Sequence, residues 1–147
     1  MLKGIDSLLH ADLLYVLAAM GHGDELAIVD RNFPAAAKSQ RLVRLDGADL
    51  CTAARAILTV FPVDHFEPAP VAGMQDGSAP DTTPEVQLDV LRLVEASEGR
   101  RVAMASVSRQ EFYTRSSAAF GVIATSEARP YGCVLLTKGV IHEPAGS

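Results

Sequence analysis

The chain has 147 residues, with 13 Lys and Arg against 18 Asp and Glu, and 48% of its residues are hydrophobic. This length suits a single domain with a core of its own, and the apolar fraction excludes a disordered chain. The net charge of −5 argues against a nucleic-acid partner, and no apolar run approaches the roughly 20 residues that span a bilayer.

Apolar spacing and turn residues predict four elements in the first half of the chain. Leu13, Leu17 and Met20 recur at helical spacing, and Gly21 follows as a helix stop. The next apolar stretch alternates like a strand and ends in an acid. The predicted elements are a helix over 13–20, strands over 26–30 and 42–45, and a helix over 50–61.

The second half begins with a long loop and then alternates helices and strands. Residues 67–84 are rich in Pro, Gly, Ser and Asp, and Thr83 before Pro-Glu predicts the N-cap of the next helix. The predicted elements are a strand over 71–75, a helix over 84–96, a strand over 102–106, a helix over 109–117, and strands over 119–125 and 133–137. This order predicts a three-layer α/β/α single domain with a central mixed, partly parallel sheet over 1–142 and a flexible tail over 143–147.

Composition also bears on setting and assembly. Cys51 and Cys133 belong to no CxxC pair or zinc-spaced cluster, which is typical of free, buried thiols in a cytoplasmic protein. Beyond Lys3 there is no basic region of a secretory signal. A mean hydropathy of +0.17 without any Trp indicates that part of the surface is buried in an oligomer.

The first candidate for chemistry is His22, which stands between two glycines after the first predicted helix. The glycines let the backbone bend and leave the imidazole accessible, which suits proton transfer near neutral pH. The alternative is a turn in which His22 caps a carbonyl at the helix end. His10, His65 and His142 show no metal-ligand spacing, so no metal site is expected.

The second candidate is Asp30, at the end of an apolar strand and on the face expected for Leu26 and Ile28. Open α/β sheets bind ligands at the carboxyl ends of strands. The alternative is a solvated acid that pairs with Arg31. Because eight residues of extended chain cover roughly 26 Å, His22 and Asp30 serve one small substrate only if the segment folds back or two subunits share the site.

The third candidate region runs from Arg109 to Cys133 and contains four of the eight aromatic residues. Tyrosine stacks on the apolar face of a sugar and also forms hydrogen bonds. Structural alternatives stand beside each residue: core packing for Phe112-Tyr113, a solvated charge for Arg109, and a turn for Tyr131-Gly132.

Several other chemistries lack their motifs. The chain contains no GxGxxG, no Walker loop and no GxSxG elbow, so dinucleotide, nucleotide and serine-hydrolase functions have no support. Cys133 would act as a nucleophile only with a base beside it.

Four stretches are together specific: MGHGDE, Asp30 followed by NFP, FYxR, and YGxxLLxKGV. With them, from residue 1 to about 140, the chain resembles the family of L-fucose mutarotases and D-ribose pyranases. The fucose branch is the more similar one, because of AAMGHGDE, FYTRSSAAF and Arg109.

The resemblance implies that no cofactor is needed and that His22 and Tyr131 are catalytic. It implies toroidal decamers of two pentameric rings, with pockets close to subunit contacts, whereas the absence of a nucleic-acid or membrane partner is the expectation from charge and hydropathy given above. The residues that it implies for sugar binding are Asp30, Arg109, Tyr113, Gly132 and Cys133.

Two positions depart from the family pattern. Cys133 stands where the family usually has Asn, and a thiol donates and accepts hydrogen bonds only weakly. Ser126 stands where the family usually has Gly, which affects the turn there.

The expected function is therefore a cofactor-independent, cytoplasmic mutarotase that interconverts the α and β anomers of L-fucose or a related monosaccharide by acid–base ring opening. The alternatives are a D-ribose pyranase and a non-catalytic sugar-binding or transport-accessory protein.

Overall fold

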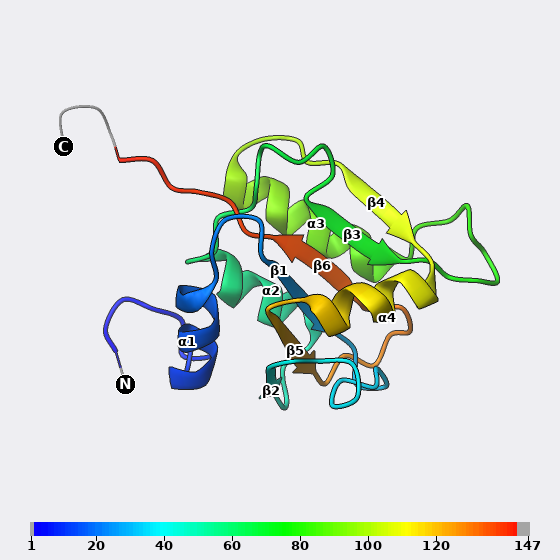
Figure 1. Ribbon diagram of the computed structural model, residues 1–147, viewed down its shortest axis with the longest axis horizontal. Helices are drawn as coiled ribbons and strands as arrows, with labels where there is room; N and C mark the ends of the chain where they lie inside the picture. The colour runs from blue at the N-terminus through cyan, green and yellow to red at the C-terminus, as the bar shows by residue number, and fades with distance from the viewer. Residues whose placement is uncertain (1, 144–147) are drawn as a thin grey trace.

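The computed structural model describes residues 2–143 and folds them into a six-stranded sheet with helices on both faces (Figure 1). The strands are β1 Glu25–Val29, β2 Leu42–Leu45, β3 Val71–Met74, β4 Met104–Val107, β5 Gly121–Thr125 and β6 Val134–Thr137. The helices are α1 Ala11–Ala19, α2 Leu50–Leu58, α3 Glu85–Glu98 and α4 Arg109–Ala118. Residues 144–147, most of the predicted tail, lie outside the described part.

The strand order is β2-β5-β1-β6-β3-β4, and β6 alone runs against its neighbours. β1 and β2 are both parallel to β5, and β3 is parallel to β4. Since β6 is antiparallel to both β1 and β3, the other five strands all point the same way. Their carboxyl ends therefore share one edge of the sheet with the start of β6, which we call the carboxyl edge; the opposite one is the amino edge.

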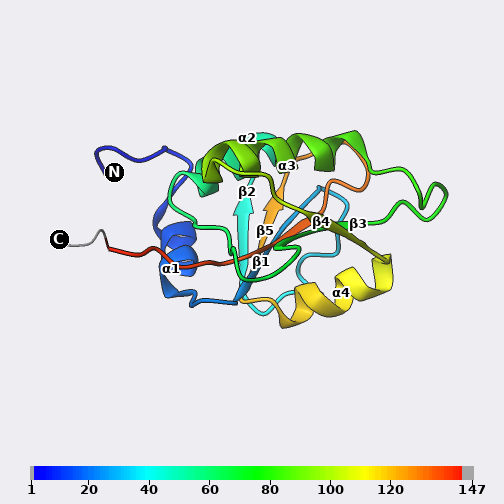
Figure 2. The ribbon, with the colours of Figure 1, turned by 90° about the horizontal axis from the view of Figure 1, so that it is seen from above.

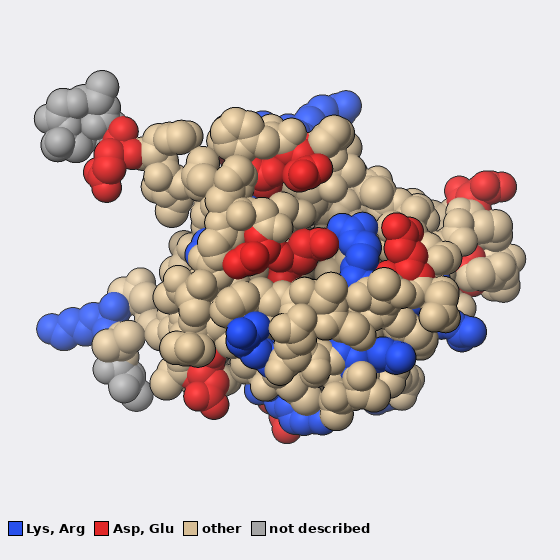
Figure 3. All heavy atoms as spheres, viewed as in Figure 1, with Lys and Arg blue, Asp and Glu red and all other residues tan. Residues whose placement is uncertain are grey.

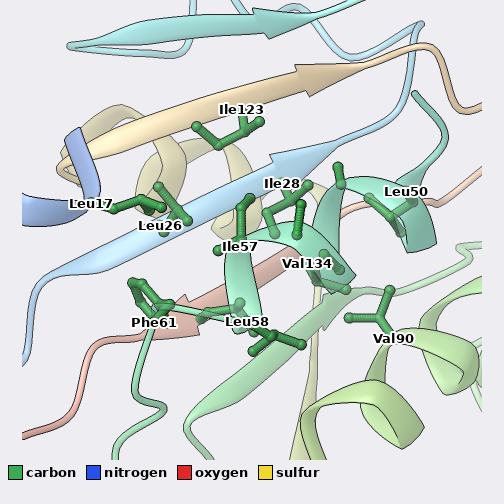
Figure 4. Close-up of a cluster of buried hydrophobic side chains, with 14 of the residues drawn as sticks. Leu17, Leu26, Ile28, Leu50, Ile57, Leu58, Phe61, Val90, Ile123 and Val134 are labelled. Carbon is green, nitrogen blue, oxygen red and sulfur yellow. The ribbon is translucent and has the colours of Figure 1, made fainter. Parts of the chain in front are cut away.

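Two apolar clusters fill the space on either side of the sheet. Leu26 and Ile28 of β1 pack with the apolar faces of α1, α2 and α3 (Figure 4). Ala27 and Val29 point to the other face, where they pack with Phe112 of α4. Figure 2 shows α2 and α3 on one side of the strands and α4 on the other. The predicted three-layer α/β/α architecture with a central mixed, partly parallel sheet is confirmed.

Each predicted helix and strand is present, several boundaries are shifted, and the shifts in α2 and α3 have clear physical causes. The helix predicted over 50–61 ends at Leu58, and Phe61 stays buried because turn hydrogen bonds to Ile57 carry the chain on over the same face. Thr83 is not an N-cap: Pro84 takes that position, and no side chain caps α3. α3 continues to Glu98 because Gly99, with φ of 68°, supplies the left-handed stop.

Within residues 2–143, none of the helices combines the length and the apolar composition that crossing a membrane requires.

Candidate active site

A recess of about 200 Å³ lies at the carboxyl edge, and we call it the carboxyl-edge pocket. Its walls come from the segment after β1, the end of β3, helix α4 and the turn before β6. Its lining combines polar and apolar residues, which suits a small polar ligand with an apolar side. The lining residues are Asp30, Asn32, Phe33, Met74, Tyr113, Pro130, Tyr131 and Cys133.

Asp30 follows β1 and is only 8% exposed. Its Oδ1 accepts the backbone N–H of Asn32 at 3.0 Å, and its Oδ2 lies 3.6 Å from the thiol of Cys133. Cys133 belongs to the cluster under α4, so the prediction that Asp30 shares the face of Leu26 and Ile28 is wrong. The strand alternation stops at Val29, because the chain turns at Asp30. Burial also excludes the solvated-acid alternative.

Cys133 is buried, at 2% exposed. Burial raises its thiol pKa well above the ordinary value, and the negative charge of Asp30 raises that pKa further. The side chain is therefore a neutral thiol that donates to Asp30, and the raised pKa disfavours the thiolate that a nucleophile requires.

Tyr131 and Gly132 form the turn that leads into β6. Tyr131 has a φ of 60°, in the left-handed region. A Cβ on Gly132 would lie 3.0 Å from Cγ of Glu127 and 3.2 Å from the Arg129 carbonyl, so glycine lets the turn fold this closely beside Glu127 and Arg129. Tyr131-Gly132 therefore forms a turn, as the structural alternative predicts, and the same turn lines the pocket.

Two residues of α4 lie on the same edge. The Tyr113 ring packs edge-on against Phe33 at 5.5 Å and reaches the pocket. Arg109 begins α4 directly after β4, exposed and outside the pocket lining. Phe112 points instead into the core at 0% exposed, as its packing alternative predicts.

His22 lies at the amino edge, in the turn between α1 and β1. Asp24 Oδ2 accepts the N–H of Gly21 at 2.7 Å, and Gly23 has a φ of 88°, which together hold the turn. His22 does not cap α1. Lys138 does so instead, since its Nζ donates to the Leu17 and Met20 carbonyls at 2.8 and 2.6 Å, where the helix dipole favours a cation.

The His22 ring is paired with Asp64, a residue that the sequence patterns do not single out. Nε2 of His22 lies 3.0 Å from Oδ1 of Asp64, and the two side chains are 46% and 1% exposed. Burial raises the pKa of Asp64, but hydrogen bonds from the N–H of Glu67 and from His22 outweigh it, so the net shift is downward. An ionised, buried carboxylate thus orients a half-exposed imidazole.

No motif spacing links positions 22 and 64. They meet because Val63 pairs with Lys138 just beyond β6, beside the turn that carries His22. A search for every acid in a loop next to a histidine would have found Asp64 only among many equivalent positions.

The structure does not bring His22 to the carboxyl-edge pocket within one chain. β1 is extended from Glu25 to Val29, after the turn that carries His22, and the chain covers roughly 16 Å from Glu25 to Asp30. The fold-back alternative is therefore wrong. Beside His22, the amino edge carries a polar recess of about 320 Å³, lined by Gly23, Glu25, Glu67, Ala69, Glu111, Arg115 and Thr137. In the view of Figure 1, acidic and basic side chains lie side by side near the middle of the molecule (Figure 3).

These features define the class of protein. It is an α/β domain with a small polar pocket at the carboxyl ends of its strands and with a histidine, oriented by a carboxylate, at the opposite edge of the sheet. Among the described residues, no group of three or more His, Cys, Asp or Glu side chains is arranged to hold a metal ion.

The chain belongs to the RbsD / FucU transport protein family, whose model matches residues 3–141. It is 36% identical over 140 residues to the L-fucose mutarotase of Histophilus somni, covering 95% of this chain and 97% of that one.

Two solved structures are similar over nearly their whole length. The fucose mutarotase of Streptococcus pneumoniae, in complex with L-fucose, is 31% identical with a TM-score of 0.88, covering 96% of this chain and 100% of that one. The protein Atu2016, a candidate sugar binding protein, is 42% identical with a TM-score of 0.90, covering 97% of each chain.

Proposed function

We propose that the protein is a mutarotase that interconverts the α and β anomers of L-fucose or a closely related monosaccharide. The relatives named for L-fucose support the substrate. The observation that carries the chemistry is the His22–Asp64 pair, in which a buried acid orients an accessible imidazole. We place the reaction in the cytoplasm, as expected from the cysteine content of the sequence.

The reaction needs one base and one acid. The base takes the proton of the anomeric hydroxyl, the bond from C1 to the ring oxygen breaks, and the acid protonates that oxygen. Rotation about the bond from C1 to C2 and reclosure then yield the other anomer. Positioned acid–base groups contribute about 10²–10⁴-fold, which suits a reaction that already proceeds without a catalyst.

We assign proton transfer to His22 and Tyr131. With Nε2 of His22 engaged by Asp64, Nδ1 is left to face the substrate. The remaining predicted residues contact the sugar: Asp30, Arg109 and Tyr113 through polar side chains, and Gly132 and Cys133 from the turn that Tyr131 begins.

We further propose that two copies of the chain share each site, with His22 from one and the carboxyl-edge pocket from the other. The extended strand β1, which covers roughly 16 Å from Glu25 to Asp30, lies between them in one chain and supports this. Large apolar side chains also remain exposed around the amino edge and α1, which is typical of a contact surface. They are Tyr15 at 69%, Val60 at 41%, Phe66 at 63% and Ile141 at 79% exposed. A homodecamer, as the resemblance implies, would supply such contacts.

Exchange NMR on equilibrated α- and β-L-fucose tests the activity. The protein should speed anomer exchange, His22→Ala should remove the gain, and His10→Ala, an exposed histidine at the start of α1, should keep it. No gain with the intact protein, or full activity in His22→Ala, would refute the proposal.

The same samples separate the alternatives. L-fucose binding by calorimetry without any exchange would indicate the non-catalytic sugar-binding protein. Faster conversion of D-ribose than of L-fucose would indicate the pyranase, which the fucose-named relatives do not favour.

A further inference from the structure

Gln87 is a buried polar side chain with no part in the chemistry above. It lies in the first turn of α3 and is 2% exposed. Its Nε2 donates to the Met74 carbonyl at 2.7 Å and to the Tyr131 carbonyl at 2.8 Å. Met74 ends β3 and Tyr131 precedes β6, so one amide group joins two segments that line the carboxyl-edge pocket.

Gly73 of β3 leaves room in the sheet for the Gln87 side chain. A Cβ on Gly73 would overlap the side-chain oxygen of Gln87 and would lie 2.6 Å from its Cδ. Gly73 does not have a positive φ, so its glycine serves the close approach of Gln87 and no special backbone conformation. The glycine in β3 and the glutamine in α3 therefore fit together, so that the Gln87 amide packs directly against the strand.

Tyr131 is the residue that needs such a restraint. Among the described residues it is the one non-glycine with a positive φ. A side chain with a Cβ is unfavourable there and keeps the conformation only where its surroundings hold it. The hydrogen bond from Gln87 to the Tyr131 carbonyl restrains this turn.

We propose that Gln87 is a positioning residue, which holds Tyr131 in the conformation that presents its side chain to the carboxyl-edge pocket. Its effect on catalysis rests on the proposed function, whereas its hold on Tyr131 does not.

The effect of Gln87 on the conformation of Tyr131 can be measured without any activity assay. The chain has three tyrosines, so fluorotyrosine labelling gives three ¹⁹F NMR signals that Tyr→Phe variants assign. Gln87→Met keeps the length of the side chain without its donors, and Gln87→Glu keeps its shape with acceptors in their place. In both, the Tyr131 signal should shift or broaden, while that of Tyr15, 69% exposed on α1, stays.

Val94→Ala is the matched control, since Val94 is buried two turns further along α3. It weakens the same helix and should leave the Tyr131 signal in place. An unchanged Tyr131 signal in whichever Gln87 variant folds, or an equal shift in Val94→Ala, would overturn the proposal.

Catalysis supplies a second readout. Gln87→Met should lower kcat/KM by about tenfold in the native background and by much less in a Tyr131→Phe background, because coupled residues are not additive. Equal losses in both backgrounds would show that Gln87 does not act through Tyr131. If the native protein exchanges no anomers, the proposed function fails, and the ¹⁹F signals still decide the role of Gln87.

Discussion

His22 and Asp64 are 42 residues apart in sequence, and their side chains meet at 3.0 Å. His22 supplies an imidazole that can accept or donate a proton, and Asp64 supplies a fixed negative charge behind it. Neither residue alone defines a site, because an isolated surface histidine and a buried acid each have ordinary structural roles.

Replacing Asp64 by Asn should lower the rate of anomer exchange by about 100-fold, because the imidazole loses its orientation. Exchange NMR on L-fucose measures this rate. Asp46→Asn, at an exposed turn position, is the control and should keep the native rate. Native exchange in Asp64→Asn would contradict the orienting role.

Asp64 should also make stability depend on pH. Its pKa is lower in the folded protein than the ordinary value of 3.8, so its contribution is full above that value. The contribution is lost as the pH falls through the lower pKa of the folded state. Thermal unfolding should show native protein more stable than Asp64→Asn above pH 4, with the gap closing in more acidic buffer. A gap that widens toward low pH would contradict this sign.

Cys133→Asn should tighten sugar binding, with KM for L-fucose falling several-fold. An amide donates and accepts stronger hydrogen bonds than a neutral thiol beside Asp30. Cys51→Ser, on α2 and away from the pocket, is the control. An unchanged KM would show that the sugar does not contact position 133.

At the scale of elements, the turn between β5 and β6 determines the shape of the carboxyl-edge pocket. Glu127 is 4% exposed and accepts hydrogen bonds from the N–H of Leu50 and from the Arg129 side chain. Burial raises the pKa of Glu127, but the Arg129 contacts outweigh it and the net shift is downward, so Glu127 stays ionised. The turn is thereby tied to the start of α2.

Gly132→Ala should destabilise the protein by about 1–3 kcal/mol and reduce exchange, because a Cβ would press on Glu127 and on the Arg129 carbonyl at 3.0 and 3.2 Å. Gly77→Ala is the control: nothing lies within 4 Å of its Cβ position, and its φ is not positive. Denaturant unfolding gives both free energies. Equal free energies of unfolding for the two variants would mean that the turn accommodates the added methyl group, which would contradict this prediction.

At the scale of the whole molecule, the proposed sharing of each site by two copies predicts complementation between inactive chains. His22→Ala and Asp30→Asn should each be inactive alone. Unfolded together in equal amounts and refolded, they should recover about a quarter of native exchange, because random assembly leaves that share of subunit contacts intact.

The control mixes His22→Ala with Asp64→Asn, which place both defects on the same edge of the chain. The rate of anomer exchange in that mixture should stay near the rates of the two variants measured alone. Recovery there, or none in the first mixture, would contradict a site formed by two copies.

Much of the fold follows from local pattern. Apolar residues at helical or strand spacing must be buried, so Leu13, Leu17 and the 26–30 stretch predict their elements whatever surrounds them. Boundaries were less predictable. Thr83 has the chemistry of an N-cap, yet Pro84 occupies that position, because the path of the preceding loop and not the residue type decides which backbone groups are within reach.

The sequence by itself determined the layers of the sheet and the chemical groups available: a histidine between glycines, an acid after β1, and a tyrosine before β6. Only the tertiary structure decided which of them meet. It paired His22 with Asp64, joined Gln87 to Tyr131, and put the length of β1 between His22 and Asp30. The physical reason is that burial acts on each segment separately, whereas contacts between distant residues depend on strand order and direction, which one antiparallel strand, β6, sets for this sheet.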